Sequence, residues 1–202
     1  IIINLDCCLL IKENTLKILI KTFEGLEDIL EQELIDLNMS DITKGRRLVS
    51  CSGEMADLYL LNLALHTGVR ILTPIYEFEC DSQDDFYNKI KLHDWEQYID
   101  VDDTFAIDAV ISSDIFSHSK YMAYLTKDAI VDKFRDKYDK RPSIDTEFPH
   151  ARFNVHIHNQ KVTVNLDSSG ESLHKRGYRV DINEAPLNEV LAAGILKMSG
   201  WD

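Results

Sequence analysis

Apolar residues recur along the first third of the chain with two different periods, which predict alternating strands and helices. Residues 17–23 are short, apolar and β-branched, as in a strand. Residues 25–38 and 54–68 carry apolar side chains three and four positions apart, which is typical of amphipathic helices. Residues 42–50 and 69–78 are extended runs. The order of strand, helix, strand or hairpin, helix and strand favours a small α+β domain of the ferredoxin-like type.

A polar stretch at residues 81–85 separates this domain from a second set of elements. Short helices are expected around residues 83–99, a strand over 104–110 and a long helix over 120–138. The long helix is expected to bury one apolar stripe, made of Leu125, Ala129, Phe134 and Tyr138.

Two neighbouring runs predict a β-hairpin. Residues 152–157 and 161–166 both alternate apolar and polar side chains, and Asn159 lies in the tight connection between them. The first run is expected to bury Phe153, Val155 and Ile157. A last apolar stripe predicts a helix within residues 183–201, whose apolar face would need a partner.

The charge of the chain is uneven. The net charge is −13 over 202 residues, which by itself argues against a nucleic-acid partner. Residues 1–111 have a net charge of −13, whereas residues 112–180 hold 12 Lys and Arg and 9 Asp and Glu, a net of +3. A local binding face for an anionic partner would have this distribution, and so would ordinary variation of a protein surface.

The cysteines indicate neither a disulfide framework nor a metal site. Cys7, Cys8, Cys51 and Cys80 contain no Cys-x-x-Cys pair, so reduced thiols of an intracellular protein are expected. No apolar run is long enough to span a membrane.

One short segment concentrates cations and planar groups. It follows the predicted hairpin, turns at Gly170, and contains five candidate RNA-binding residues: His174, Lys175, Arg176, Tyr178 and Arg179. Cations can bind phosphates, and planar side chains can stack on unpaired bases. The alternative is that Arg176 and Arg179 form salt bridges to neighbouring acids and hold a joint between domains.

Three further cations are candidates for the same interface. Lys120 and Lys127 lie on the predicted long helix, where a solvated helix surface is the alternative. Arg152 lies on the side of the hairpin away from its apolar residues, which either faces RNA or is covered by helices.

An ordered series of short motifs points to a family. Leu166 to Gly170 is followed by Leu173 to Arg179 and by Ala185 to Leu187. Further pieces precede them in order: Phe23 to Glu27 with Glu33 and Leu34, then Tyr59, Asn62, Leu63 and Arg70, then Asp94 and Trp95, then Lys127 to Asp132, then Arg141 and Pro142. Over roughly residues 16–202, the chain resembles bacterial THUMP-domain RNA methyltransferases, and most closely those that methylate guanine N2 in large-subunit ribosomal RNA.

The resemblance implies a ferredoxin-like domain over residues 16–80 and a THUMP RNA-binding domain over 81–180. Residues 181–202 would be a linker and the first helix of a Rossmann-like methyltransferase domain that is otherwise missing. The family's catalytic domain carries a loop of Asp-Pro-x-Cys-Gly-Ser-Gly type and a motif of Asn-Pro-Pro-Tyr type, and neither occurs in this sequence. No catalytic, cofactor-binding or metal-binding residue is therefore assigned, and the fragment alone is expected to be inactive.

The resemblance also implies partners. Structured RNA is expected, with large-subunit ribosomal RNA as the substrate of the full-length enzyme and S-adenosylmethionine as its cofactor. DNA and membranes are not expected, and the location is expected to be cytoplasmic. Two alternatives stay open: a THUMP protein that modifies transfer RNA, and a stand-alone RNA-binding adaptor.

Overall fold

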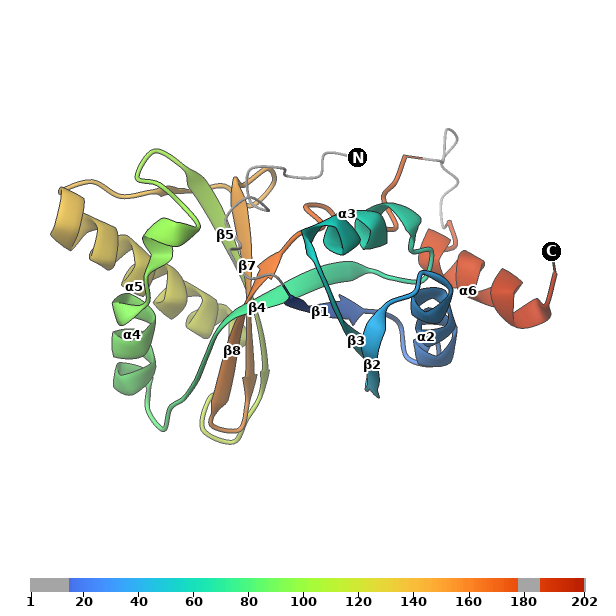
Figure 1. Ribbon diagram of the computed structural model, residues 1–202. Helices are drawn as coiled ribbons and strands as arrows, with labels where there is room; N and C mark the ends of the chain where they lie inside the picture. The colour runs from blue at the N-terminus through green and yellow to red at the C-terminus, as the bar shows by residue number, and fades with distance from the viewer. Residues whose placement is uncertain (1–14, 178–185, 202) are drawn as a thin grey trace. The chain divides into compact units, whose positions relative to one another are not determined.

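The computed structural model describes residues 15–177 and 186–201, which form two compact units. The first unit contains residues up to Thr73 and, in addition, the described residues from Ser168 onward. The second unit contains Pro74–Asp167. The chain therefore leaves the first unit within one strand and returns to it after the second unit is complete (Figure 1).

The first unit is an antiparallel sheet with two helices. Its strands follow the order β2-β3-β1-β4, and each neighbouring pair is antiparallel. Along the chain the elements are β1 (Leu16–Lys21), α2 (Glu27–Asp36), β2 (Ser40–Gly45), β3 (Leu48–Gly53), α3 (Met55–Ala64) and β4 (Arg70–Glu79). This βαββαβ order and strand arrangement is the ferredoxin-like fold, so the predicted fold class is confirmed for this unit.

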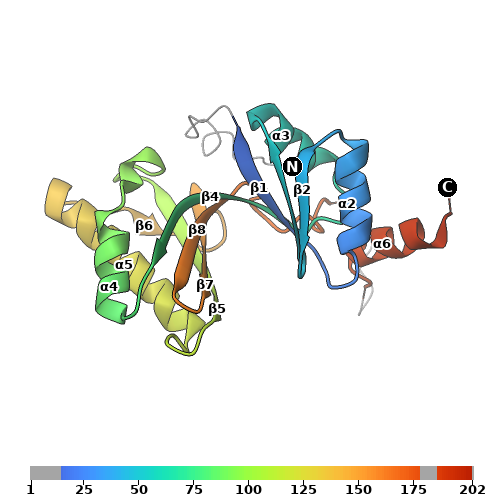
Figure 2. The same ribbon diagram turned by 60° about the horizontal axis from the view of Figure 1, so that its bottom comes forward.

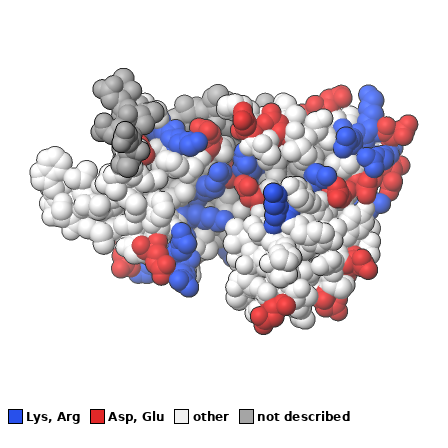
Figure 3. Space-filling view, turned by 180° about the vertical axis from the view of Figure 1, so that it is seen from behind, with Lys and Arg blue, Asp and Glu red and all other residues white. Residues whose placement is uncertain are grey.

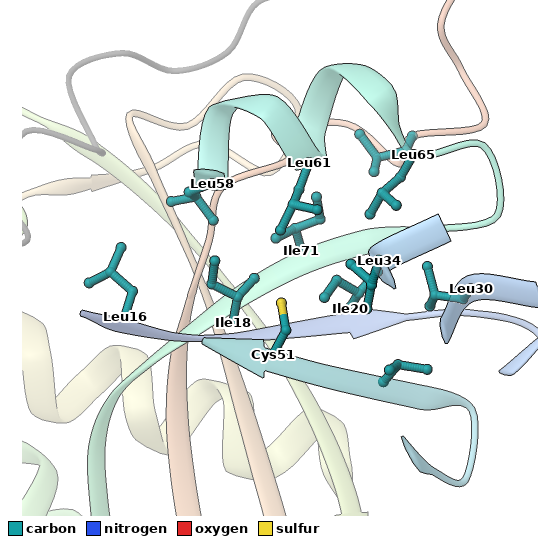
Figure 4. Close-up of a cluster of buried hydrophobic side chains, with 12 residues drawn as sticks. Leu16, Ile18, Ile20, Leu30, Leu34, Cys51, Leu58, Leu61, Leu65 and Ile71 are labelled. Atoms are coloured by element: carbon teal, nitrogen blue, oxygen red, sulfur yellow. The ribbon is translucent and has the colours of Figure 1, made fainter. Parts of the chain in front are cut away.

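Both helices of this unit cover the same side of its sheet. Because successive side chains of a strand point to opposite faces, Leu16, Ile18 and Ile20 of β1 all reach this side and are buried. They meet leucines of α2 and α3, and Figure 4 shows these side chains gathered between the strands and α3. Burial of each such side chain is worth about 1.5–3 kcal/mol, so this cluster is the main source of the unit's stability.

The second unit combines parallel and antiparallel strands. Its sheet runs in the order β8-β7-β5-β6, and the later part of β4 lies next to β8. Strands β5 and β7 are parallel, β5 and β6 are parallel, and β7 and β8 form the predicted hairpin, with Asn159 in the left-handed region. The elements are α4 (Gln83–Leu92), a 3-10 turn (Trp95–Gln97), β5 (Thr104–Ser112), α5 (Ser119–Tyr138), β6 (Ser143–Ile144), β7 (Ala151–His158) and β8 (Lys161–Asp167).

The helices α4 and α5 lie side by side in both ribbon views (Figures 1 and 2) and enclose an aromatic core. Phe153 of β7 meets Trp95 edge to face at 5.1 Å, and the Trp95 indole donates to the carbonyl of Ile90 at 2.6 Å. The stripe predicted for α5 was partly wrong, because Leu125 is only half-buried and Tyr138 is exposed. The residues of α5 that are buried are Met122, Thr126, Ala129, Ile130, Val131 and Phe134, because both the sheet and α4 cover this helix.

A last helix, α6 (Glu189–Ser199), belongs to the first unit and packs on α2. A Cβ added to Gly194 would lie 2.6 Å from Leu26 Cδ2, so the absence of a side chain permits this close packing. Lys197 Nζ lies 3.2 Å from the buried Glu33 Oε1. Apolar residues of α6 are also exposed, namely Ile195, Leu196 and Met198, and so is Trp201 just after the helix.

Candidate nucleic-acid interface

The candidate cations after the hairpin lie on a stretch that we call the return segment, residues 168–177. It runs beside the start of β4 in the first unit. The amide of Ser168 donates to the carbonyl of Ile71 at 3.0 Å, and the amide of Leu173 donates to the carbonyl of Val69 at 2.9 Å. The hydroxyl of Ser169 accepts a hydrogen bond from the Ile71 amide at 2.7 Å.

The return segment belongs to the first unit, whereas the sequence assigned residues 81–180 to one RNA-binding domain. The physical reason is burial: Leu173 is part of the hydrophobic cluster of the first unit. Gly170 supplies the turn that starts this contact, since its φ of 65° lies in the left-handed region.

Arg176 binds main-chain carbonyls where α3 ends. Its guanidinium donates to the carbonyl oxygens of Asn62 and Leu63, both at 2.9 Å, and to that of Leu65 at 2.7 Å. The last carbonyls of a helix have no partner within the helix, and a cation near them also interacts favourably with the helix dipole. Arg176 therefore caps α3, a role that differs from the salt bridges to acids considered in the sequence analysis.

Lys175 is the exposed cation of the return segment. Its side chain is 58% exposed and lies 3.5 Å from Glu171 Oε1, which is similarly exposed. Such a surface pair is worth little and separates readily. His174 is half-buried, and its Nδ1 lies 2.8 Å from the Ser172 hydroxyl. Tyr178 and Arg179 lie outside the described residues.

The two lysines predicted on the long helix lie in the N-terminal half of α5. Lys120 is exposed and has no ion pair within residues 15–177 and 186–201. Lys127 pairs with its neighbour Asp128 at 2.6 Å and keeps a third of its side chain exposed. Both lysines are therefore positioned to meet an anion from solution.

The side chain of Arg152 is mostly buried and is held by polar contacts. Its side chain is only 13% exposed, donates to the Thr146 carbonyl at 2.7 Å, and lies 3.4 Å from Asp108. Arg152 lies on the face of the sheet opposite Phe153, because neighbouring residues of a strand point to opposite faces. Phe153 contacts Trp95 on the helix-covered face, so Arg152 does not join the lysines of α5.

The predicted residues thus fall into three groups: Lys175 with His174 and Arg176 on the return segment, Lys120 with Lys127 on α5, and Arg152 alone. Elsewhere on α5 the cations are paired with carboxylates. Lys133 and Lys137 both pair with Glu96, and Arg135 pairs with Asp132. Figure 3 shows one face of the molecule, on which basic and acidic side chains lie next to each other.

Two aromatic residues beside Lys120 and Lys127 were missed by the sequence analysis. Tyr121 and Tyr124 of α5 are 45% and 53% exposed. Their spacing of three positions, outside the buried stripe, was the available signal. It was overlooked because aromatic residues in a helix usually belong to the core.

The two cysteines that the structure describes, Cys51 and Cys80, are both buried. Burial raises the pKa of Cys51 to about 12 and that of Cys80 to about 11, so both thiols stay protonated and unreactive near neutral pH. No group of three or more His, Cys, Asp or Glu suited to a metal ion occurs among residues 15–177 and 186–201. Within the same residues, no helix is both long and apolar enough to cross a bilayer.

Two known domain families match this chain, one in each unit. Residues 17–72 match the RlmL ferredoxin-like domain, and residues 80–167 match the THUMP domain. The chain therefore carries an RlmL-type ferredoxin-like domain followed by a THUMP domain, the two domains that the predicted resemblance to THUMP-domain RNA methyltransferases implied.

Two relatives found by sequence carry RNA methyltransferase names. The chain is 42% identical over 178 residues to the Ribosomal RNA large subunit methyltransferase K/L of Desulfotalea psychrophila, a match that covers 88% of this chain and 25% of the relative. It is 38% identical to a putative RNA methyltransferase of Synechocystis sp., with 88% of this chain and 46% of the relative covered. A solved putative methyltransferase, SMU.472, complexed with SAH, aligns with a TM-score of 0.77 at 25% identity, over 94% of this chain and 50% of that one. The chain thus spans a quarter to a half of the proteins it matches.

Proposed function

We propose that this chain is the RNA-binding part of an S-adenosylmethionine-dependent methyltransferase that modifies guanine N2 in large-subunit ribosomal RNA. In this proposal the two units dock RNA so that a guanine reaches a catalytic domain elsewhere in the full-length protein. The location implied is the cytoplasm, where bacterial ribosomal RNA lies.

One observation carries the proposal. This chain, which carries the two domains in order, aligns over 88% of its length with a relative named for methylation of large-subunit ribosomal RNA. The Synechocystis relative is also named a putative RNA methyltransferase, which supports RNA as the class of substrate.

The cofactor is proposed for the full-length protein alone. A structural relative complexed with SAH supports S-adenosylmethionine as the methyl donor. The residues of this chain do not fit that cofactor, because none of the prolines Pro74, Pro142, Pro149 and Pro186 follows an aspartate or asparagine, as both family motifs require. No chemical step is therefore assigned to residues of this chain.

The return segment supplies an RNA contact through Lys175 and depends on Arg176 for its position. The Lys175 ammonium is exposed and only weakly held by Glu171, so it can move to a phosphate at little cost. Arg176 is engaged with the end of α3 and fixes the backbone next to Lys175. His174, Tyr178 and Arg179 belong to the same proposed contact.

A binding titration tests the proposal. The chain is titrated against a labelled fragment of large-subunit ribosomal RNA, an unmodified transfer RNA and a DNA duplex of matched length, each at several salt concentrations. We expect tightest binding to the ribosomal fragment, with affinity that falls as salt rises because phosphate contacts release counterions. Equal affinity for the DNA duplex, or no measurable binding to any RNA, would contradict the proposal.

Two single variants locate the contact. Lys175→Ala is expected to weaken RNA binding and to flatten the salt dependence by about 0.7–0.9 in slope, the effect of one phosphate contact. Glu171→Ala is the matched control, since it removes the partner of Lys175 and is expected to leave affinity unchanged or higher. Preference for transfer RNA would favour a transfer-RNA-modifying protein. Absence of guanine methylation by the full-length protein would favour an adaptor.

A further inference from the structure

The N-terminal half of α5 presents one surface that combines lysines with exposed aromatic rings. It consists of Lys120, Tyr121, Tyr124 and Lys127, which we call the tyrosine face. Residues three, four and seven positions apart lie on the same side of a helix. The opposite side is buried through Met122, Thr126 and Ala129, so the tyrosine face points away from the core.

The side chains in the two halves of α5 differ in whether they contact other parts of the protein. In the C-terminal half, Tyr87 of α4 donates to Asp132 at 2.7 Å, Lys91 of α4 pairs with Asp136 at 2.6 Å, and the ring of Tyr138 packs against Phe134 and Lys137. Helix α4 thus lies along this half (Figure 2). In the N-terminal half, the rings of Tyr121 and Tyr124 make no hydrogen bond and no ring contact with any residue that the structure describes.

The charge on the tyrosine face is suited to an anion. The first turn of α5 contains no acidic residue, and its amides receive no side-chain cap from His118. Lys120 is unpaired among the described residues, and Lys127 has only its neighbour Asp128. The surface is therefore locally basic, although the chain as a whole has a net charge of −13. An acidic protein segment and a nucleic acid would both match this charge. The aromatic rings next to the cations favour nucleic acid, because bases can stack on them.

The start of α5 is held in place, so its rings are presented in a fixed position. The Ser113 hydroxyl donates to the Asn159 carbonyl in the hairpin turn at 2.7 Å, and the amide of Asn159 donates to the Ser112 carbonyl at 2.9 Å. Phe116, three residues before α5, is buried in the aromatic core. Rigid aromatic groups lose little conformational entropy when a base stacks on them.

We propose that the tyrosine face binds unpaired nucleotides of the RNA, with Tyr121 and Tyr124 stacking on bases and Lys120 and Lys127 contacting the flanking phosphates. This inference rests on the proposed function and adds to it a specific surface and a class of ligand, single-stranded RNA. Base stacking on aromatic side chains requires bases that are free of a duplex, which is why the expected ligand is a loop or a strand end.

The test compares a single-stranded RNA oligonucleotide with a blunt RNA duplex of the same sequence. The double variant Tyr121→Ala with Tyr124→Ala is expected to weaken single-strand binding by roughly tenfold or more, since each stacked base is worth about 1 kcal/mol or more. Binding of the duplex is expected to stay nearly unchanged, because its bases are not free to stack on the tyrosines and the lysines that contact phosphates are retained. Tyr124→Phe is expected to keep full affinity, because stacking needs the ring and not the hydroxyl.

Tyr138→Ala is the matched control, because Tyr138 is an exposed tyrosine of the same helix that lies outside the tyrosine face. It is expected to leave RNA affinity unchanged. Lys120→Ala is expected to lower the salt slope by about 0.7, whereas the tyrosine variants leave the slope unchanged. Circular dichroism of each variant checks that the fold is retained.

The outcomes separate this inference from the function on which it rests. If the unaltered chain binds no RNA, the proposed function fails. If it binds RNA and the double tyrosine variant binds the single strand equally well, only the tyrosine face is rejected. Equal losses for single strand and duplex would also reject base stacking at this surface.

Discussion

Replacement of Arg176 by alanine is expected to destabilise the first unit, because it removes the cap of α3. The guanidinium donates three hydrogen bonds of 2.7–2.9 Å to main-chain carbonyls. A hydrogen bond with a charged partner contributes about 1.5–3 kcal/mol, but water can reach these partly exposed carbonyls once the side chain is gone. We therefore expect a net loss of about 2 kcal/mol, which includes the interaction with the helix dipole.

Urea unfolding and amide hydrogen exchange measure this loss. Arg176→Ala is expected to lower the unfolding midpoint and to speed exchange in α3, while exchange in α5 of the second unit stays unchanged. Arg176→Lys is expected to recover only part of the stability, since one ammonium cannot reproduce the planar fork of a guanidinium.

Lys175→Ala is the matched control for this experiment. Lys175 is the exposed neighbour of Arg176, so its removal is expected to change stability by less than about 0.5 kcal/mol. If Arg176→Ala changes stability by no more than Lys175→Ala and α3 keeps its protection, the cap does not stabilise the unit and the reasoning is wrong.

Three further predictions concern other parts of the chain. Burial opposes ionisation of Glu96, but hydrogen bonds led by the one from Lys137 lower its pKa from 4.5 to about 2. Glu96→Gln should therefore cost about 2 kcal/mol at pH 7, and urea titrations at several pH values should show this cost shrinking as the pH falls from about 4.5 and vanishing only below about pH 2. Cys51, whose pKa burial raises to about 12, should resist iodoacetamide in the native chain and react in urea, and rapid native labelling at this position would contradict its burial. Gly194→Leu should loosen α6 from α2, because even a Cβ at this position approaches Leu26, and unchanged exchange of the α6 amides would show that the contact is absent.

The order of strands and helices could be predicted because it depends on local periodicity. The βαββαβ order and the hairpin of β7 and β8 both follow from the spacing of apolar residues within short windows. The exposure of Lys120 and Lys175 could also be predicted, since both lie outside the apolar stripes.

The roles of the two arginines could not be predicted in the same way. The carbonyls that Arg176 binds lie 111–114 positions earlier in the chain, so only the tertiary fold reveals them. Arg152 lies on the predicted polar side of its strand, but the Thr146 carbonyl and Asp108 hold its side chain and leave it mostly buried. In both cases the guanidinium binds groups of the protein itself, and the order of charges along the sequence does not show this.

The interrupted path of the first unit affects how the chain is made. A chain leaves the ribosome with its N-terminus first, and each domain generally folds as a unit once all of it has emerged. Residues 15–73 emerge early, but Leu173, which completes their hydrophobic cluster, and Arg176, which caps α3, emerge about a hundred residues later. The second unit is therefore fully synthesised before the first unit has all the residues of its core and its α3 cap.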